Sequence, residues 1–388
     1  MNFKILYAEG DGIGKDIVPP TVEIIKEAVK RVEDASIEFE RIELGLEALD
    51  KYGDRFPRQA QDMLMSYRYL LKGPIETPVG EGERSVNVRI RLLLDLYANI
   101  RPVRYESYMQ SPLKDPNGVD LVIIRENTDD IYRGIEWPYD SDEASRLRSI
   151  MKDQFNIDIS SDSGVGIKSI SRRATERIAR FAIEYALKNN RRSITIMHKG
   201  NIMKYTEGFF REVVYNLYKR EYADKIYLEN EQPQDSSRRI LINDRIADNM
   251  LQQIIINPRS YDIILAPNLN GDYVSDAAGA LIGNIALLGS ANIGDDAAMF
   301  EAVHGTAPKY AGQHLANPTG IINAGVMMLE HLGLSNAALL IRRALAEMYN
   351  RKIVTRDVAR YMNVNPVSTD EFCSSIIDYI KDSGNDAR

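Results

Sequence analysis

Asp272 and Asp276 are the residues whose type and spacing point most directly to chemistry in this chain of 388 residues. They stand in the stretch NLNGDYVSDAAG, residues 268–279, after a short apolar run over residues 263–266 that predicts a buried strand. Asn and Gly should end that strand, and the acids should open a helix. Residues four positions apart share one face of a helix, so both carboxylates would point the same way. Such a pair suits a hard divalent cation, Mg²⁺ or Mn²⁺, or equally a helix N-terminus stabilised by acidic residues.

Arginines recur near the ends of predicted elements, although the chain carries a net charge of −7. Arg binds carboxylates bidentately, so a cluster of them suits a ligand with several carboxylates, whereas scattered arginines would only be solvated surface. Ser85 stands at the N-cap position of a helix predicted to run to Tyr97, and that helix also carries an amide and a guanidinium. The residues concerned are Asn87 on the helix and the arginines Arg84, Arg91, Arg101 and Arg125.

Lys199 follows a strand predicted over residues 193–197. Open α/β sheets bind ligands at the carboxyl ends of their strands, so this lysine is a candidate catalytic ammonium, although most single lysines are surface residues. A helix predicted over residues 244–256 carries Asp248, a third acid to add to the pair above.

Strands and helices alternate along the chain, which predicts an α/β architecture. The first strand, residues 3–8, is followed by Gly10, Gly12 and Gly14 and by a helix over residues 15–32. The third glycine of the Rossmann fingerprint would stand at position 15, where the chain has Lys15, so a tight strand-to-helix turn is favoured over a dinucleotide site. Further strands are expected over residues 36–42, 69–72 and 119–124, and further helices over residues 175–188, 277–288, 319–332, 336–350 and 369–380.

A loop over residues 300–320 is rich in Gly, Pro, Asn and Thr and could wrap a nucleotide. Residues 130–172 have few long apolar runs and are read as an insertion or an oligomerisation arm. The acidic composition argues against a general nucleic-acid binder. Cys373 is the only cysteine, which excludes an intrachain disulfide and fits a reducing cytoplasm. Neither a signal peptide nor a membrane span is apparent in the sequence.

Five long segments in the same order resemble the isocitrate/isopropylmalate dehydrogenase family, and within it the prokaryotic NADP-dependent isocitrate dehydrogenases. They are TPVGEGERSVNVRIRLLLDLYANIRPVRY, IRENTDDIYRGIEW, MHKGNIMKYTEG, NLNGDYVSDAAG and HGTAPKYAGQHLANPTG. The resemblance runs from Gly10 to about Arg360. It implies the α/β fold of that family, which is not the standard Rossmann fold, and oxidative decarboxylation of isocitrate to 2-oxoglutarate and CO₂ in the tricarboxylic acid cycle.

The resemblance also implies roles for individual residues. Tyr132, Lys199 and Asp248 would be catalytic, with Lys199 and Asp248 contributed by the neighbouring subunit. Asp272 and Asp276 would bind Mg²⁺ or Mn²⁺ together with the partner's Asp248. The substrate would be bound by Ser85, Asn87, Arg91, Arg101 and Arg125. The cofactor NADP would be bound by Thr77, His304, Gly305, Thr306, Ala307, Lys309, Tyr310, Asn317, Arg356 and Arg360.

One position departs from the family pattern. Arg356 stands where well-known bacterial relatives have a tyrosine that reads the 2′-phosphate of NADP. A cation should still favour that phosphate, so NADP is retained as the expected cofactor, and the strength of the preference is open. NAD-using relatives typically carry an acid where Lys309 stands.

The resemblance further implies a cytoplasmic homodimer with shared active sites. Residues 1–96 and 283–388 would form a large domain with the cofactor loop. Residues 97–129 and 173–282 would form a small domain with the metal site and the dimer interface, and residues 130–172 a clasp arm. Three alternatives stay open: the same chemistry on 3-isopropylmalate or homoisocitrate, a non-catalytic regulatory subunit, and a nucleotide-binding module without redox chemistry.

Overall fold

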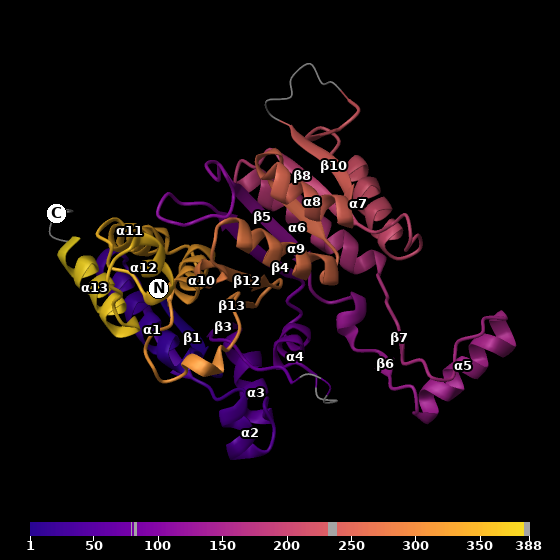
Figure 1. The fold of residues 1–388 in the computed structure, drawn as a ribbon, viewed down its shortest axis with the longest axis horizontal. Coiled ribbons are helices and arrows are strands. Elements are labelled where there is room, and N and C mark those ends of the chain that lie inside the picture. Colours follow the sequence, from indigo (N-terminus) through magenta and orange to yellow (C-terminus); the bar gives the residue numbers. More distant parts are fainter. Residues whose placement is uncertain (79, 81–83, 232–238, 384–388) are drawn as a thin grey trace.

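One mixed sheet of eleven strands organises the computed structural model, which describes residues 1–78, 80, 84–231 and 239–383 (Figure 1). Neighbouring strands are parallel except for three antiparallel contacts in the centre, between β13, β12, β4 and β5. The order across the sheet is β2 (Ser36–Arg41), β1 (Asn2–Ala8), β3 (Tyr69–Lys72), β13 (Ala298–Ala302), β12 (Gly289–Ile293), β4 (Ala98–Arg104), β5 (Asp120–Glu126), β11 (Ile263–Ala266), β8 (Ser193–His198), β10 (Ile240–Ile246) and β9 (Ile226–Leu228).

Helices cover both faces of the sheet, because its central strands are apolar on both sides. On β5, Val122 and Ile124 face one hydrophobic cluster, and Leu121 and Ile123 face another. The first cluster contains side chains of α1 (Gly14–Val32), α6 (Arg172–Lys188), α7 (Glu207–Glu221), α10 (Thr319–His331), α11 (Ser335–Asn350), α12 (Arg356–Met362) and α13 (Thr369–Ser383). The opposite face carries α8 (Ala247–Ile256) and α9 (Asn268–Leu281) at one end and α3 (Arg58–Tyr67) and α4 (Val86–Leu93) at the other.

Between β5 and α6, the part of the chain that contains β6 (Glu136–Trp137), β7 (Val165–Gly166) and α5 (Asp142–Phe155) leaves the body of the molecule as an arm (Figure 1). In the arm, β6 and β7 form a short antiparallel pair. Ala144 is the buried residue of α5, in agreement with the few apolar runs in this part of the sequence. The remaining elements are α2 (Leu46–Tyr52), η1 (Asp130–Arg133), η2 (Pro258–Ser260), η3 (Ile285–Leu287) and η4 (Pro308–Tyr310).

The helix with the two candidate metal ligands begins earlier than expected. The strand β11 is confirmed, but α9 starts at Asn268, directly after Pro267, and ends at Leu281, so the helix predicted over residues 277–288 is wrong. Asn usually favours turns over helices. Here the side chains of Asn268 and Asn270 form hydrogen bonds with other elements, and these bonds keep both residues in the helix. Asp272 and Asp276 therefore share one helix, as expected, but from its second turn onwards.

Three other predicted boundaries were wrong because strand pairing overrides local sequence signals. The helix that begins after Ser85 ends at Leu93 rather than Tyr97, and the chain then joins β4. Asp244 lies in β10, which pairs in parallel with β8, so α8 starts only at Ala247. The predicted loop over residues 300–320 includes the end of β13, which lies between β12 and β3.

The turn after β1 packs closely against the loop that follows β13. Gly12 has φ +58°, and a Cβ added to it would lie 2.0 Å from the carbonyl oxygen of Thr306. The following amide, Ile13 N, donates to the same oxygen at 2.9 Å. The predicted tight turn is thus confirmed, and it supports the loop that follows β13.

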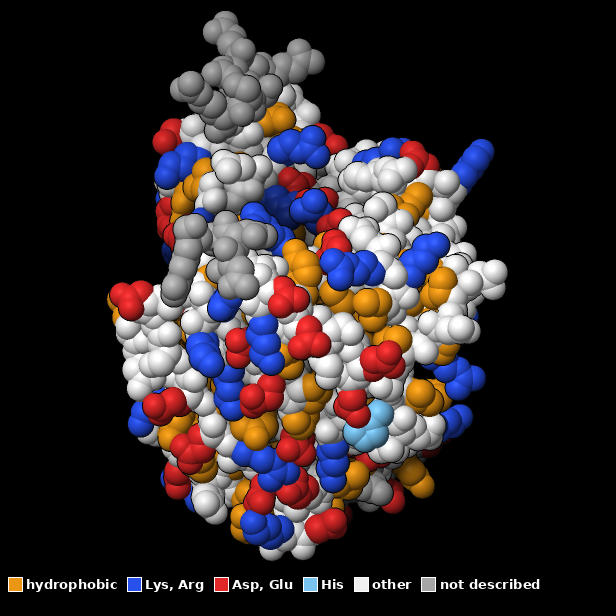
Figure 2. Space-filling model, turned by 90° about the vertical axis from the view of Figure 1, so that its left-hand side faces the viewer, with side chains coloured by type: hydrophobic (Ala, Val, Ile, Leu, Met, Phe, Trp, Pro, Cys, Tyr) orange, Lys and Arg blue, Asp and Glu red, His pale blue; other side chains and the backbone are white. Residues whose placement is uncertain are grey.

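Charges of both signs are interspersed over the face of the molecule in Figure 2, and Lys and Arg side chains gather in a hollow in its upper part. Within the described residues, none of the helices is both long enough and apolar enough to span a membrane.

Candidate active site

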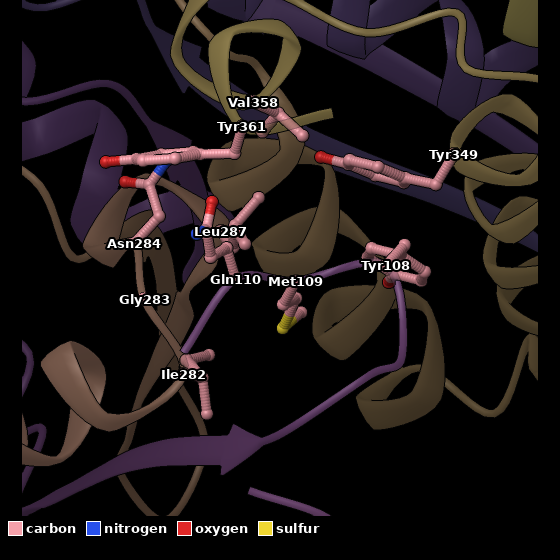
Figure 3. Close-up of a pocket in the computed structure, with 10 residues that line it drawn as sticks. All are labelled: Tyr108, Met109, Gln110, Ile282, Gly283, Asn284, Leu287, Tyr349, Val358 and Tyr361. Carbon is pink, nitrogen blue, oxygen red and sulfur yellow. The ribbon is translucent and has the colours of Figure 1, made fainter. Parts of the chain in front are cut away.

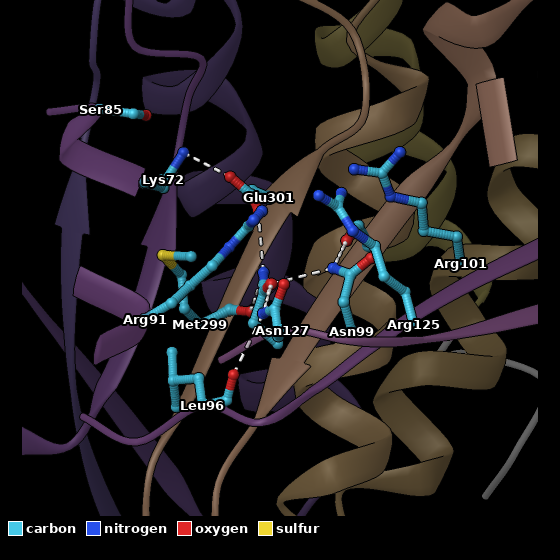
Figure 4. Close-up of polar contacts among 12 residues, drawn as sticks. Lys72, Ser85, Arg91, Leu96, Asn99, Arg101, Arg125, Asn127, Met299 and Glu301 are labelled. Carbon is cyan, nitrogen blue, oxygen red and sulfur yellow. Dashed lines mark hydrogen bonds and ion pairs between the residues drawn. The ribbon is translucent and has the colours of Figure 1, made fainter. Parts of the chain in front are cut away.

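Two arginines from neighbouring strands meet the two acids of α9. Arg101 on β4 and Arg125 on β5 are both buried, and Figure 4 shows their guanidinium groups pointing toward the same region as that of Arg91. Arg125 Nη1 forms an ion pair with Asp272 Oδ1. Arg101 reaches Asp272 at 3.5 Å and Asp276 at 3.1 Å. These residues were predicted from the sequence, but their contact was not. The antiparallel pairing of β4 and β5 brings the two guanidinium groups together.

The arginines set the charge states of this cluster. Burial disfavours ionisation of Asp272, but the charges of Arg125 and Arg101 outweigh it and lower the pKa of that carboxyl below its usual value. Asp276 is more exposed and pairs with Arg101 alone among the described residues, and partial desolvation, together with the Asp272 charge, outweighs that pairing and raises its pKa. Burial also lowers the pKa of Arg125 to about 10, against the opposing effect of the Asp272 charge. Two neighbouring acids thus have environments that shift their pKa values in opposite directions.

Tyr132 joins the same cluster from η1. Its hydroxyl donates to Asp272 Oδ2 at 2.8 Å, and the Arg125 guanidinium lies 4.8 Å from the centre of its ring. Burial raises the pKa of the Tyr132 phenol against the opposing charge of Arg125, and the Asp272 charge adds to the rise. The phenol is therefore protonated at neutral pH and can act as a proton donor.

Arg91 has a different environment from the other two arginines. Its Nη2 lies 3.1 Å from Glu301 Oε1, and Lys72 Nζ lies 2.6 Å from Glu301 Oε2 (Figure 4). Burial opposes ionisation of Glu301, but the charges of Lys72 and Arg91 hold its pKa well below the usual range. Sequence reasoning missed Lys72 and Glu301. Lys72 ends β3, so its position at the carboxyl end of a parallel strand was the available signal.

Several predicted ligand-binding side chains have buried polar atoms that lack a partner among the described residues. They are Asn87 Oδ1, Arg91 Nε, Arg101 Nε and His304 Nε2. Buried polar atoms are normally hydrogen-bonded, so each exception needs an explanation, and ligand binding is one explanation for these four. Ser85 is half-buried at the N-cap of α4, and its Oγ accepts a hydrogen bond from Thr77 Oγ1 at 3.0 Å, which joins Thr77 to the predicted substrate residues.

Lys199 and Asp248 form a separate pair. Lys199 Nζ lies 2.6 Å from Asp248 Oδ1, and that contact lowers the pKa of the carboxyl. No three His, Cys, Asp or Glu side chains of the described chain come together as a metal-binding group. Asp272 and Asp276 do converge, since both reach one guanidinium, and their oxygen atoms are of the kind that Mg²⁺ and Mn²⁺ prefer. The donor set of these two carboxylates fits such a cation.

The predicted cofactor residues surround one loop. His304, Gly305, Thr306 and Ala307 precede η4, which presents Lys309 and Tyr310 to solvent. Burial lowers the pKa of His304, and its Nδ1 lies 3.0 Å from the carbonyl of Gly305, so the buried Nε2 is free to accept a hydrogen bond. Gly312 N donates to Asp16 Oδ2 at 3.0 Å, which ties this loop to α1.

Helix α12 lies beside this loop and carries the two remaining predicted cofactor residues. Asp357 Oδ2 accepts hydrogen bonds from Asn317 at 3.0 Å and from Asn284. Its neighbour Arg356 is exposed, as is Arg360, whose guanidinium lies 4.3 Å from the ring centre of Tyr361. A pocket beside α12 is lined by Tyr361, Asn284 and Tyr108 among others (Figure 3). That pocket is mainly apolar and contains none of the predicted site residues.

Comparisons with known proteins agree with the resemblance seen in the sequence. Residues 4–376 match the sequence model of a family described as isocitrate/isopropylmalate dehydrogenase. The chain is 46% identical over 385 residues to the isocitrate dehydrogenase [NADP] of Archaeoglobus fulgidus, covering 97% of this chain and 92% of that protein. It is 41% identical to the isocitrate dehydrogenase [NADP] of Staphylococcus aureus, covering 97% and 95%.

Among solved structures, the isocitrate dehydrogenase of Methylococcus capsulatus is similar, with a TM-score of 0.82 and 36% sequence identity. The match covers 98% of this chain and 99% of that one. The expected α/β fold of this dehydrogenase family is thereby confirmed.

Proposed function

The chain belongs to the isocitrate/isopropylmalate dehydrogenase family, and from that premise we propose that it oxidises isocitrate with NADP and releases 2-oxoglutarate and CO₂. This is a reaction of the tricarboxylic acid cycle. The observation that carries the proposal is the convergence of Arg101, Arg125 and Tyr132 on Asp272. That cluster combines cations for carboxylates, acids for a metal ion and a protonated phenol.

Arg91, Arg101 and Arg125 bind the substrate carboxylates in this proposal. Arg101 and Arg125 each have more than one N–H group in the cluster, and a tricarboxylate can replace part of their present contacts with the acids. Ser85 and Asn87 then bind the carboxylate that distinguishes isocitrate from other malates. Polar groups suit this place because an isopropyl group there would leave them buried without partners, which is costly. That argument disfavours 3-isopropylmalate.

Asp272 and Asp276 of one chain, with Asp248 of a second copy, would hold Mg²⁺ or Mn²⁺. When bound, the ion supplies Lewis-acid polarisation of the substrate's hydroxyl and carboxylate oxygens, and NADP supplies the hydride acceptor. The arginines hold the substrate carboxylates in a fixed orientation, which hydride transfer requires. The Lys199–Asp248 pair of the second copy relays the proton of the C2 hydroxyl away from the substrate. After CO₂ has left, Tyr132 donates its phenolic proton to C3.

Lys309, Tyr310, Arg356 and Arg360 bind the 2′-phosphate of NADP in this proposal. Three of them are cations, and all four are exposed beside the loop that follows β13. The remaining cofactor contacts are assigned to Thr77, residues 304–307 and Asn317.

We also propose a cytoplasmic homodimer with shared active sites. The Lys199–Asp248 pair has no contact with Asp272 or Asp276 among the described interactions, which supports its use by a second copy. Exposed apolar side chains on α8 and α9 offer an interface: Ile255, Ile256 and Tyr273 are 56%, 67% and 59% exposed. The division into a large domain, a small domain and a clasp arm over residues 130–172 is retained as part of this proposal.

The test follows absorbance of the reduced cofactor with isocitrate, NADP and Mg²⁺. Replacing isocitrate by 3-isopropylmalate or homoisocitrate, and NADP by NAD, should each reduce kcat/KM strongly. Equal turnover of another malate would change the substrate assignment. Failure of all pairs would favour a regulatory subunit or a nucleotide-binding module.

A further inference from the structure

Asp130, Lys168 and Glu207 form a chain of charges next to the candidate catalytic groups, and the proposed chemistry does not use them. Lys168 Nζ lies 2.6 Å from Asp130 Oδ1 and 3.0 Å from Glu207 Oε1. Both carboxylates are buried, and the lysine side chain is only 17% exposed. A buried ion pair is weak evidence for stability, because desolvation offsets the attraction. Its contacts with neighbouring elements are therefore the better guide to its role.

Glu207 connects the turn that carries Lys199 to the first turn of α9. Its Oε2 accepts hydrogen bonds from the backbone amide of Lys199 at 2.5 Å and from Asn270 Nδ2 at 2.6 Å. Asn270 stands two residues before Asp272. One buried carboxylate thus binds both the lysine backbone and the helix that presents the candidate metal ligands.

Asp130 connects the same helix to Tyr132. Its Oδ2 accepts from Leu269 N at 3.1 Å, and its Oδ1 accepts from Ile131 N at 2.7 Å. Its φ is +72°, a left-handed conformation that is uncommon outside glycine and persists where surrounding contacts impose it. Tyr132 follows two residues later, so the backbone conformation at Asp130 helps to fix the position of the Tyr132 side chain.

We infer that Asp130, Lys168 and Glu207 are positioning residues that link two of the proposed active sites. They fix Tyr132 and Asp272, which serve the chain's own site, relative to Lys199, which serves the site of the second copy. Lys168 is central, because it bridges the carboxylate beside Tyr132 and the carboxylate beside Lys199. It lies between β7 and α6, so the returning end of the arm takes part in aligning the two sites. The inference rests on the proposed function for the roles of the three aligned groups. A displacement of about 1 Å can cost about 100-fold in rate, so such a device affects turnover more than binding.

The first test compares Lys168→Met with Lys152→Met in the full-length protein. Lys152 lies on the arm helix α5 and is 66% exposed, so its loss should leave kcat unchanged. Lys168→Met should lower kcat about 30-fold or more while KM for isocitrate stays within about threefold, because the substrate arginines do not contact this chain of charges. Lys168→Arg restores the cation and should recover kcat to within about threefold of the wild type. A rise in KM matching the loss in kcat, or an unchanged kcat, would overturn the inference.

The second test needs no activity. Hydrogen exchange is measured over peptides that contain residues 199–203 and 268–271, whose Lys199 and Leu269 amides donate to Glu207 and Asp130. Lys168→Met and Glu207→Gln should both speed exchange in these two segments, and Lys152→Met should not. Glu207→Gln keeps an oxygen acceptor and only breaks the ion pair, so it serves if Lys168→Met does not fold. Unchanged exchange in both segments overturns the inference even if isocitrate is not the substrate. A wild type that is inactive with isocitrate but shows the predicted exchange changes refutes only the proposed function.

Discussion

The cluster around Asp272 and the loop that follows β13 differ in how their charges are balanced. In the first, Arg101 and Arg125 are buried and pair with acids of α9. In the second, Lys309 and Arg356 are exposed, and no described residue forms an ion pair with either. A buried charge needs a partner from the protein itself, whereas an exposed one is hydrated until a ligand arrives.

That difference explains how each region can recognise an anion. On the substrate side, ion pairs with the acids of α9 already hold the arginines in a fixed geometry. A carboxylate ligand therefore replaces some of those contacts. The cofactor side offers solvated cations, so a phosphate gains mainly by Coulomb attraction that solvent screens. Substitutions on the substrate side should therefore have larger effects than substitutions on the cofactor side.

Asp276→Asn should have the largest effect. It removes one of two converging carboxylates, so kcat/KM with Mg²⁺ should fall about 1,000-fold, or about 4 kcal/mol. The side chain is 59% exposed, so the fold should be retained in circular dichroism. Asp115→Asn, at a surface pair with Arg259, is the control and should be neutral. Full activity in Asp276→Asn would remove this acid from the site.

Glu301→Gln tests whether internal pairing also stabilises the substrate side. It leaves the charges of Lys72 and Arg91 buried without their partner, so the free energy of unfolding near neutral pH should fall by about 3 kcal/mol. The pKa of Glu301 is lowered in the folded state, so its contribution is present above the unfolded pKa and lost as pH falls through the folded one.

Urea unfolding of wild type and variant at neutral and acidic pH measures that contribution. The two should converge as the pH falls, because the wild-type carboxylate becomes protonated. Glu347→Gln, in an exposed pair with Arg351, should change the free energy of unfolding by less than about 0.5 kcal/mol. A constant difference between wild type and Glu301→Gln at all pH values would contradict the ion-pair explanation.

Ser85→Asp places a negative charge where a carboxylate of isocitrate is proposed to bind. KM for isocitrate should rise about 100-fold, or about 2.7 kcal/mol, while KM for NADP stays within about threefold. Ser145→Asp on the exposed side of α5 is the matched control. Normal isocitrate kinetics would count against the assignment of Ser85.

Lys309→Asp should have the smallest of these effects, because its site is exposed. KM for NADP should rise about 30-fold, or about 2 kcal/mol, and KM for NAD should change little, since only NADP carries the 2′-phosphate. Lys114→Asp, on an exposed loop, controls for net charge. Equal losses for both cofactors would refute the role of Lys309. An effect as large as that of Asp276→Asn would break the proposed contrast between the two regions.

Local signals in the sequence were enough for most strands and helices. The strands β3 and β11 match their predicted residues, because short apolar runs bounded by turn residues have few alternative readings. The spacing of Asp272 and Asp276 was enough to place both on one helix. Element ends failed where partners distant in sequence decided them, as for Asp244, which parallel pairing with Ile196 draws into β10.

By itself, then, the amino-acid sequence determined the α/β class, the rejection of a Rossmann glycine loop and the residue types available for a carboxylate, a metal ion and a phosphate. Only the tertiary structure decided which of those charges meet. Lys72 and Glu301 are 229 residues apart in number yet form one buried ion pair, and Lys168 joins acids that come from separate elements. Spacing along a chain encodes the faces of single helices and strands, but the pairing of charges depends on which strands become neighbours in the sheet.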